Sequence, residues 1–240
     1  MKKGHKHYKL LLYDIERGRV ITMLADRKKE TLESYLRSLP EEFRQRISIV
    51  TMDMWEPYYE AVSNCLAHAM IVIDRFHLMR NLNDALTKAR RTIQNKAPET
   101  VKEALKGSRW LVVKNQEDLS QEEKQRLEQT FRACPELEDM YLAKEDFRQI
   151  FEQNDEAEKA EDQIGVWIKH VSERGWKPFQ KFIATVHNWW NGIINYFRSG
   201  KLTNGVAEGI NTKVKLLKRL CFGLTNTMHF KYRLLLEFYW

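Results

Sequence analysis

Cysteine, glycine and proline are all scarce in this chain of 240 residues, and long apolar runs are missing. Its three cysteines, Cys65, Cys134 and Cys221, form no Cys-x-x-Cys pair. This spacing argues against a zinc ribbon within the chain and favours a reducing compartment, the cytoplasm. The 10 glycines and 5 prolines favour long helices over a loop-rich all-β fold. No apolar stretch reaches the roughly 18 residues of a membrane span, so neither a membrane helix nor a signal peptide is expected.

The charge balance is basic, with 40 Lys and Arg against 33 Asp and Glu and a formal net charge of +7. Such a balance suits a polyanionic partner, of which nucleic acid is the usual one. Many unrelated globular proteins are mildly basic too, so charge alone leaves the two interpretations about even. Hydrophobic residues at 43% provide the material for a folded core.

The first hundred residues alternate between strand-like and helix-like segments. Two strands at 8–14 and 19–24 form a predicted hairpin whose turn contains Gly18, because glycine tolerates the required backbone conformation. Apolar spacing and flanking prolines then predict a helix over 29–39, a buried strand over 47–52, a helix from Pro57 to Leu66, a buried strand over 69–73 and a helix over 76–96. This order predicts an α/β fold with a mixed sheet.

Three parts follow from this pattern. Residues 1–97 form the first part of the α/β core. Residues 98–185 are highly charged with helical spacing and no clear strand, so they are predicted to be an all-helical insertion. Residues 186–240 supply the C-terminal helices of the core, including a helix over 206–219 after a Gly200–Gly205 loop.

Asp53 is the first candidate site residue, in the segment Thr51-Met52-Asp53-Met54-Trp55. A carboxylate directly after a buried strand lies at the sheet edge where α/β folds bind ligands, and the sheet holds its backbone rigidly enough for metal binding. The structural alternative is an N-cap of the next helix, a common position for Asp. Spacing alone favours that alternative.

Asp74 and His77 form the second constellation, in Asp74-Arg75-Phe76-His77 after the second buried strand. Residues three apart can point the same way on one helical turn, so the pair could share a metal, or His77 could donate a hydrogen bond to Asp74. An N-cap Asp and an interfacial His are the structural alternatives.

The third constellation is the segment Thr203 to Asn211, where Glu208 lies early in a helix and Asn211 one turn further on. A carboxylate beside a basic helix face suits a site that holds both metal and phosphate. A capped surface helix with a solvated cationic face is the alternative. The basic residues expected to contact phosphate are Lys213, Lys215, Lys218 and Arg219.

These motifs, taken in order, resemble the DDE transposases of bacterial insertion sequences, and more narrowly the ISL-three group. They are Asp-Met-Trp-x-x-Tyr at 53–58, Ile-Asp-Arg-Phe-His at 73–77, Asn-Gly-x-x-Glu-Gly-x-Asn at 204–211, Lys-Leu-Leu-Lys-Arg at 215–219 and Phe-Gly at 222–223. Each motif is short, but their ordered combination is highly specific. The resemblance covers almost the whole chain and is weakest over 98–180.

The resemblance implies an RNase H-like catalytic domain that cleaves and joins DNA strands. Three acidic residues of such a domain bind two divalent ions, usually Mg²⁺. Residue by residue, Asp53 corresponds to the second acidic residue and Glu208 to the third. Asp74, His77 and Asn211 correspond to supporting positions. Transposon ends and target DNA are the implied partners, and a homo-oligomer is a possible assembly.

One family position has no counterpart in this chain. The first Asp of the family precedes a basic segment like Lys3-Gly4-His5-Lys6-His7-Tyr8, and no carboxylate stands before that segment here. Asp14 matches a different family position. The first strand of the sheet is therefore expected to be missing, and this chain, N-terminally truncated, is expected to be inactive or nearly so by itself.

Two alternatives stay open, and each has an observable consequence. A non-catalytic DNA-binding or regulatory fragment would bind DNA without cleaving it, and an unrelated helical protein would have no sheet under Asp53 and Asp74. For the transposase interpretation, the carboxylates of Asp53 and Glu208 should lie within roughly 8 Å, because paired metal ions are about 3.5–4 Å apart. The tryptophans of the insertion are more often core than base-stacking residues: Trp110, Trp167 and Trp176.

Overall fold

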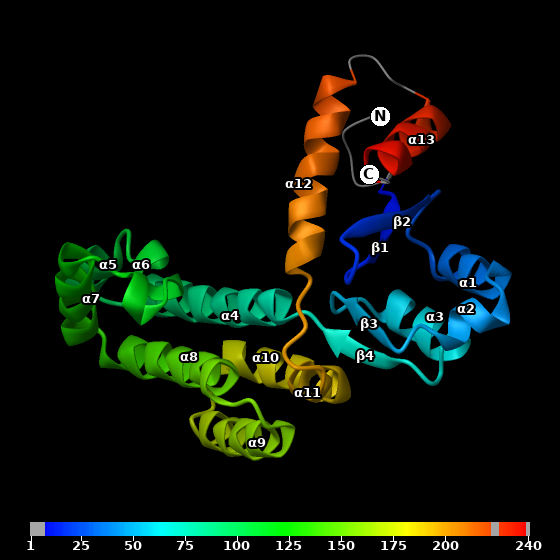
Figure 1. The fold of residues 1–240 in the computed structure, drawn as a ribbon. Coiled ribbons are helices and arrows are strands. Elements are labelled where there is room, and N and C mark those ends of the chain that lie inside the picture. Colours follow the sequence, from blue (N-terminus) through cyan, green and yellow to red (C-terminus); the bar gives the residue numbers. More distant parts are fainter. Residues whose placement is uncertain (1–7, 222–225, 239–240) are drawn as a thin grey trace. The chain divides into compact units, whose positions relative to one another are not determined.

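The computed structural model describes residues 8–221 and 226–238 and has a mixed α/β fold. The chain divides into two compact units, one formed by residues 1–74 and 202–240 and the other by Arg75–Lys201 (Figure 1). The basic segment expected at 3–7 and the Phe222-Gly223 motif lie outside the described residues. No helix in the described ranges is long and apolar enough to cross a membrane.

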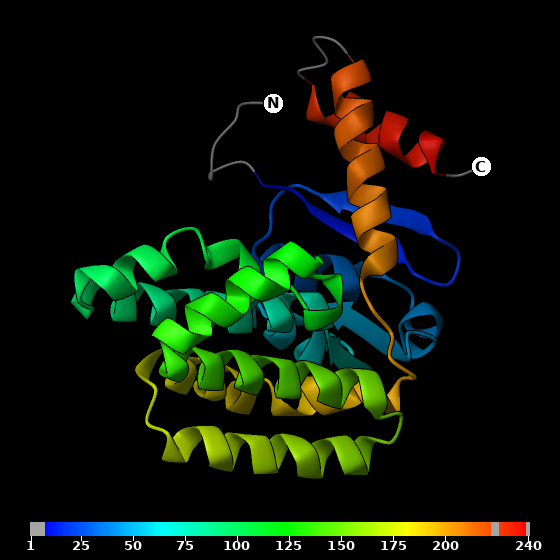
Figure 2. The ribbon, with the colours of Figure 1, turned by 90° about the vertical axis from the view of Figure 1, so that its left-hand side faces the viewer.

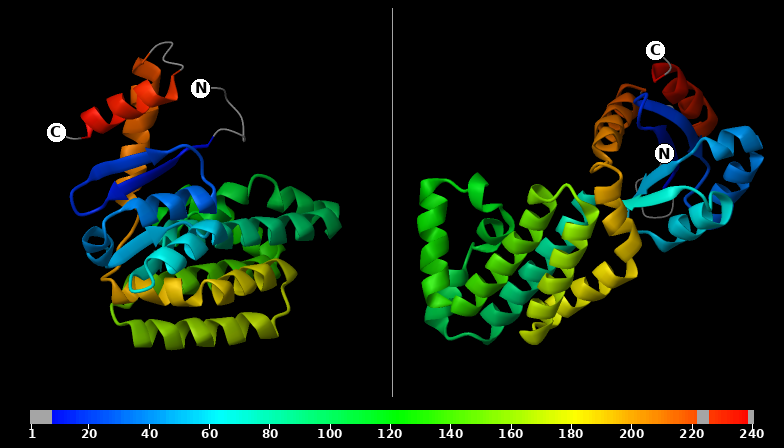
Figure 3. Two further views of the ribbon diagram at one scale, coloured as in Figure 1. Left: turned by 90° about the vertical axis from the view of Figure 1, so that its right-hand side faces the viewer. Right: turned by 60° about the horizontal axis from the view of Figure 1, so that its bottom comes forward.

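The described residues of the first unit contain two separate sheets of two strands each (Figure 3). β1 (Leu10–Asp14) pairs with β2 (Arg19–Leu24) in an antiparallel hairpin, and β3 (Ile49–Met52) pairs with β4 (Met70–Ile73) in parallel. Strand directions are therefore mixed, as the sequence predicts. In the described residues these strands form two separate pairs, because β1 and β3 each hydrogen-bond to a single neighbouring strand.

Five helices complete the part of the first unit that the structure describes. They are α1 (Lys29–Ser38), α2 (Glu41–Gln45), α3 (Glu56–Cys65), α12 (Gly205–Leu220) and α13 (Thr227–Glu237). α1 packs on α3, and α3 packs on β3. α12 and α13 cover the hairpin, and this packing buries a cluster made of Val20, Met23, Ile210, Leu217, Phe230, Leu234 and Phe238. Burying these apolar side chains holds the C-terminal helices against the N-terminal strands.

Local sequence signals account for the bounds of these elements. The hairpin turn occupies 15–18, and Gly18 has φ +61°, a conformation that glycine adopts without the steric cost of a side chain. α1 ends at Ser38, shortly before Pro40, and Pro57 occupies the first turn of α3, where its missing N–H costs nothing. The predicted hairpin, helices and buried strands are confirmed to within about two residues.

The second unit is entirely helical, and the structure describes all of its residues. α4 contacts α5, α6, α8 and α10, so it is the helix around which the others gather (Figure 2). The stretch 98–185 lies within this unit and contains no strand. Its elements are α4 (Arg75–Lys96), α5 (Glu99–Leu105), α6 (Arg109–Val113), the 3-10 turn η1 (Gln116–Asp118), α7 (Gln121–Ala133), α8 (Pro135–Gln153), α9 (Ala157–Glu173), α10 (Lys177–Asn188) and α11 (Trp190–Arg198).

An aromatic cluster forms the core of the helical unit. Phe147 lies at its centre, with ring-centroid distances of 4.7 Å to Trp167 and 5.1 Å to Phe182. The Trp167 indole also donates to the Ala143 carbonyl at 2.7 Å, which satisfies its buried N–H. Trp167 and Trp176 are both buried, so they are core residues, as expected. For Trp110 the expectation is wrong, because its side chain is 67% exposed.

Candidate metal centre

Asp53 and Asp74 leave the same edge of the β3–β4 sheet. The two strands are parallel and in register, with Met52 opposite Ile73, so the next residue of each is an aspartate. The Asp74 amide donates to the Met52 carbonyl at 2.9 Å, which continues the ladder one residue beyond the strand. The carboxyl ends of two neighbouring strands thus place two carboxylates side by side.

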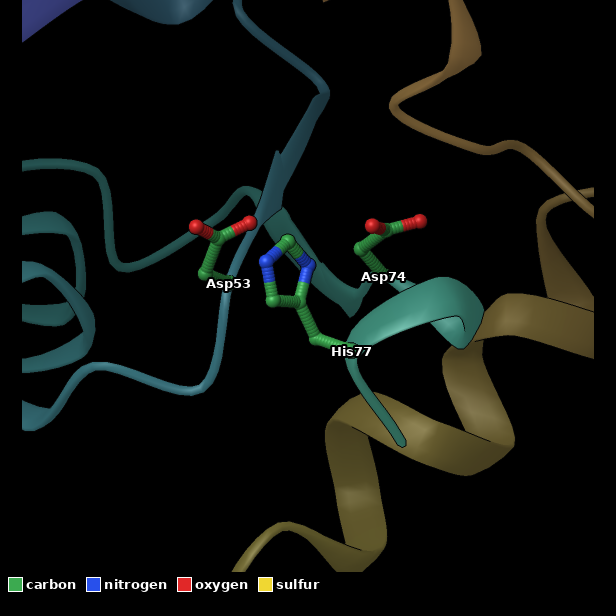
Figure 4. Close-up of side chains that lie close together, drawn as sticks. All are labelled: Asp53, Asp74 and His77. Carbon is green, nitrogen blue, oxygen red and sulfur yellow. The ribbon is translucent and has the colours of Figure 1, made fainter. Parts of the chain in front are cut away.

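His77 completes a three-residue cluster with these aspartates (Figure 4). It lies in the first turn of α4, three residues after Asp74, so one helical turn brings the ring back beside that carboxylate. One ligand atom from each of Asp53, Asp74 and His77 lies within 4.8 Å of the others. Asp53 is exposed, His77 is half-buried and Asp74 is buried. This arrangement combines an exposed carboxylate with a buried one.

Helix capping does not explain Asp53. The N-cap residue of α3 is Trp55, and no side chain caps that helix end. Asp53 instead precedes the helix by three residues, and its carbonyl accepts from the Trp55 amide at 2.7 Å. The N-cap role that spacing favoured for Asp53 is therefore wrong.

The segment that leads into α12 is attached to the same sheet edge. The Asn204 amide donates to Oδ1 of Asp74 at 3.5 Å, and the Thr51 hydroxyl on β3 donates to Oδ1 of Asn204. These hydrogen bonds join residues separated by 130 and 153 positions in the chain. The Asn-Gly motif at 204–205 thus lies beside Asp74.

Asn211 lies one helical turn beyond Glu208 and contacts the hairpin. The Tyr13 hydroxyl on β1 donates to Oδ1 of Asn211 at 2.8 Å. Burial, together with the nearby negative charge of Asp53, raises the pKa of Tyr13 to about 12. Tyr13 is therefore within electrostatic reach of Asp53, and it links α12 to the neighbourhood of that carboxylate.

Glu208 belongs to α12, but its side chain lies outside the described part of the structure. The expected Asp53–Glu208 distance therefore stays a prediction. Its neighbours along the helix are described: Asn204 bonds to Asp74, and Asn211 bonds to Tyr13. Further along α12, the four basic residues Lys213, Lys215, Lys218 and Arg219 are all exposed.

Tyr13 and Thr51 are contacts that sequence reasoning did not assign. Thr51 precedes Asp53 by two residues on the strand, so it points to the same face as Asp53 does. That alternation could have indicated a role beside the carboxylate. Nothing in the spacing of the chain links Tyr13 to a residue 198 positions later.

The fold and the site together define an α/β protein with a candidate metal centre at a parallel sheet edge. A family model described as a transposase, DDE_Tnp_ISL3, matches residues 1–234, and the chain belongs to this family. The family was expected from the ordered motifs, and that expectation is confirmed.

Curated relatives are transposases of insertion sequences. The transposase for insertion sequence element IS1001 of Bordetella parapertussis is 24% identical over 233 residues, covering 96% of this chain and 57% of the relative. The transposase for IS1557 of Mycobacterium tuberculosis is 28% identical over 244 aligned positions, covering 92% of this chain and 54% of the relative. The chain thus spans little more than half the length of these relatives. No solved structure matches it.

Proposed function

We propose that this chain is the catalytic region of an insertion-sequence transposase and that its site serves metal-dependent cleavage and transfer of DNA strands. The observation that carries the proposal is the Asp53–Asp74–His77 cluster at the carboxyl edge of a parallel strand pair. The motif order and the family membership support the same function. Glu208, on α12, is proposed as a further acidic ligand.

The residues present fit a divalent cation. Carboxylate oxygens suit Mg²⁺ and Mn²⁺, and an imidazole is compatible with Mn²⁺ in particular. Ligand atoms within 4.8 Å of one another can converge on one ion at ordinary coordination distances. When bound, such ions activate the attacking oxygen and stabilise the leaving oxygen of a phosphodiester.

The described residues have separate roles around that ion. Asp74 is 4% exposed and accepts from the Asn204 amide, so its carboxylate is held in place from the protein side. Asp53 is exposed, so it faces the side from which a DNA phosphate would approach. The basic residues on α12 would neutralise phosphates next to the scissile one, because Lys and Arg contact the DNA backbone without reading its sequence.

We further propose that an RNase H-like sheet forms when an additional strand joins β1 to β3. All five residues of β1 are only half-buried, although four of them are Leu or Tyr, whereas four of the six residues of its partner β2 are buried. β3 is likewise less buried than β4. Strands with apolar side chains and one unpaired edge are ready to pair with another strand. That strand would carry the remaining carboxylate and would come from a segment outside these 240 residues.

Metal binding is the first test of the proposed function. Mg²⁺ or Mn²⁺ should raise the melting temperature of this chain, because a ligand that binds only the folded state stabilises it by mass action. Asp53→Asn should abolish that increase. Asp84→Asn, a matched change at an exposed aspartate on α4, should leave it intact. An equal metal response in wild type and Asp53→Asn would contradict the proposal.

Cleavage is the second test. DNA carrying the ends of the element should be cut in Mg²⁺ when this region is joined to the missing strand, and Glu208→Gln should stop the cutting. DNA binding without cleavage by the joined protein would instead support the non-catalytic alternative.

A further inference from the structure

Three side chains near Asp53 form a stack that the proposed function leaves unused. The Arg27 guanidinium carbon lies 4.7 Å from the Tyr8 ring centroid and 5.1 Å from the Trp55 ring centroid. Both aromatic residues are exposed, Tyr8 to 49% and Trp55 to 41%. A planar cation thus contacts two exposed aromatic rings, which is a favourable electrostatic arrangement at a surface.

Fold stability does not account for Trp55. It occupies the N-cap position of α3, where Ser, Thr, Asp and Asn are preferred because their side chains accept helix N–H groups. An indole cannot do this, and no side chain caps this helix. Trp55 is also absent from the buried core, although burial is where a Trp contributes most to stability. A large exposed aromatic at such a position indicates a surface that binds something.

An open pocket of about 450 Å³ adjoins the stack. Its volume lies in the range of about 300–1,000 Å³ typical of small-ligand sites. It is lined by Trp55, Pro57 and side chains of both charges: Arg27, Lys28, Lys29, Glu30, Glu56 and Glu60. Lys29 is ion-paired to Glu60, and two further carboxylates remain. This mixture disfavours a bare phosphate and suits a planar, neutral ring whose edge bears both donors and acceptors.

The stack lies close to the candidate metal centre. Trp55 follows Asp53 by two residues. Burial raises the pKa of Tyr58 to about 12, and the charges of both Arg27 and Asp53 act on the same hydroxyl, the first lowering its pKa and the second raising it. Arg27 and Asp53 are therefore both within electrostatic reach of Tyr58. A polynucleotide with a phosphate at Asp53 would have a neighbouring base within reach of Trp55.

We propose that Trp55, Tyr8 and Arg27 form a stacking subsite for one unpaired base of the DNA strand held at the metal centre. The base stacks on the exposed indole, and Arg27 contacts the base plane or the adjoining phosphate. Aromatic stacking of this kind is tolerant of sequence, because every base has a π-face. This inference rests on the proposed function, since it needs a DNA strand at Asp53.

Strand binding without metal is the test, so that catalysis does not enter the measurement. Fluorescence anisotropy of a labelled single-stranded oligonucleotide in EDTA compares wild type with Trp55→Ala, Trp55→Phe and Arg27→Ala. Trp55→Ala should weaken binding about ten-fold or more, and Trp55→Phe should keep most of it. Trp110→Ala is the matched control, because Trp110 is also exposed and also has an arginine, Arg109, 4.8 Å from its ring centroid. Circular dichroism melting of each variant separates unfolding from lost contact.

Stacking itself has a direct signature. An oligonucleotide with 2-aminopurine at successive positions should lose fluorescence at one position in wild type and keep it in Trp55→Ala. Equal binding by Trp55→Ala and Trp110→Ala, or equal binding of an abasic oligonucleotide, would overturn the subsite. The stacking subsite would also be overturned if Trp55→Ala lost binding to a protein partner but bound DNA as wild type does. Metal binding without stacking would refute the subsite alone, whereas stacking without any metal response would refute the proposed function.

Discussion

The Tyr13 hydroxyl donates a hydrogen bond to Oδ1 of Asn211 at 2.8 Å, which joins the first strand to α12 across 198 residues. Asn211 belongs to the motif that carries Glu208, and Tyr13 is within electrostatic reach of Asp53. One hydrogen bond thus connects the neighbourhoods of the two carboxylates that the family pattern pairs. It also makes the attachment of α12 measurable by titration.

Stability at alkaline pH should report this attachment. Burial and the Asp53 charge raise the pKa of Tyr13 from its ordinary 10.0 to about 12, so the folded state favours the protonated hydroxyl. The resulting stability is complete below pH 10 and is lost as the pH rises towards 12. The loss should be about 1 kcal/mol, less than the shift alone implies, because the hydroxyl is only partly buried.

Tyr13→Phe should remove Tyr13's part of that alkaline loss and lower stability by about 1 kcal/mol at neutral pH, since the hydrogen bond to Asn211 is gone. Urea unfolding at pH 8 and at pH 11.5 measures both effects. Tyr232→Phe is the control, because Tyr232 is 57% exposed on α13. If Tyr13→Phe and Tyr232→Phe gave the same pH profile, Tyr13 would not be the titrating group.

Charge reversal on α12 should weaken DNA binding through the phosphates. Lys215→Glu combined with Lys218→Glu removes two exposed cations from the helix that follows Glu208. The slope of log K against log salt should become less steep by about 2, because each lost phosphate contact accounts for about 0.9. Binding titrations between 50 and 200 mM salt measure it.

The matched control for this change is Lys169→Glu with Lys181→Glu, two exposed lysines on α9 and α10. It produces the same change in net charge at another surface. Equal loss of affinity in both double variants would show that net charge, and not the α12 face, governs binding.

The helical unit should depend on a buried charge network centred on Glu145. Its carboxylate pairs with Arg148 at 2.8 Å and with Lys144, and Arg148 pairs with Glu117 at 2.7 Å. Glu145→Gln removes the carboxylate that the buried cations Lys144 and Arg148 share, so it should cost about 3 kcal/mol in a chemical denaturation experiment. Glu128→Gln, in an exposed pair 3.9 Å from Arg132, should cost less than about 0.5 kcal/mol.

The network also sets the acid stability of this unit. Burial raises the pKa of Glu145, but its contacts with Lys144 and Arg148 outweigh burial and hold that pKa below its ordinary 4.5. The folded state therefore favours the carboxylate, and its contribution is present above pH 4.5 and lost as the pH falls below it. Glu145→Gln should show a shallower loss of stability in acid. An unchanged acid profile would exclude Glu145 as the responsible group.

Much of the local structure could be predicted from the sequence. The bounds of the hairpin, of β3 and of β4 follow from short apolar runs ended by Gly, Asp or Pro, because turn chemistry acts between neighbouring residues. The positions of Asp53 and Asp74 at strand ends follow for the same reason. The exposure of individual side chains could not be predicted from the sequence. Trp110 and Trp167 both lie in helical stretches, yet the first is exposed and the second belongs to the core.

The candidate residues for the chemistry could be chosen from the sequence: Asp53 and Asp74 after buried strands, His77 one turn later and the ordered motifs of a transposase family. Which of these residues meet follows from the packing of the fold. β3 and β4 align in parallel and in register, so the two aspartates become neighbours, and Asn204 reaches the same edge from the other end of the chain. Contacts between residues far apart in sequence depend on how every element between them packs, and no local pattern encodes that packing.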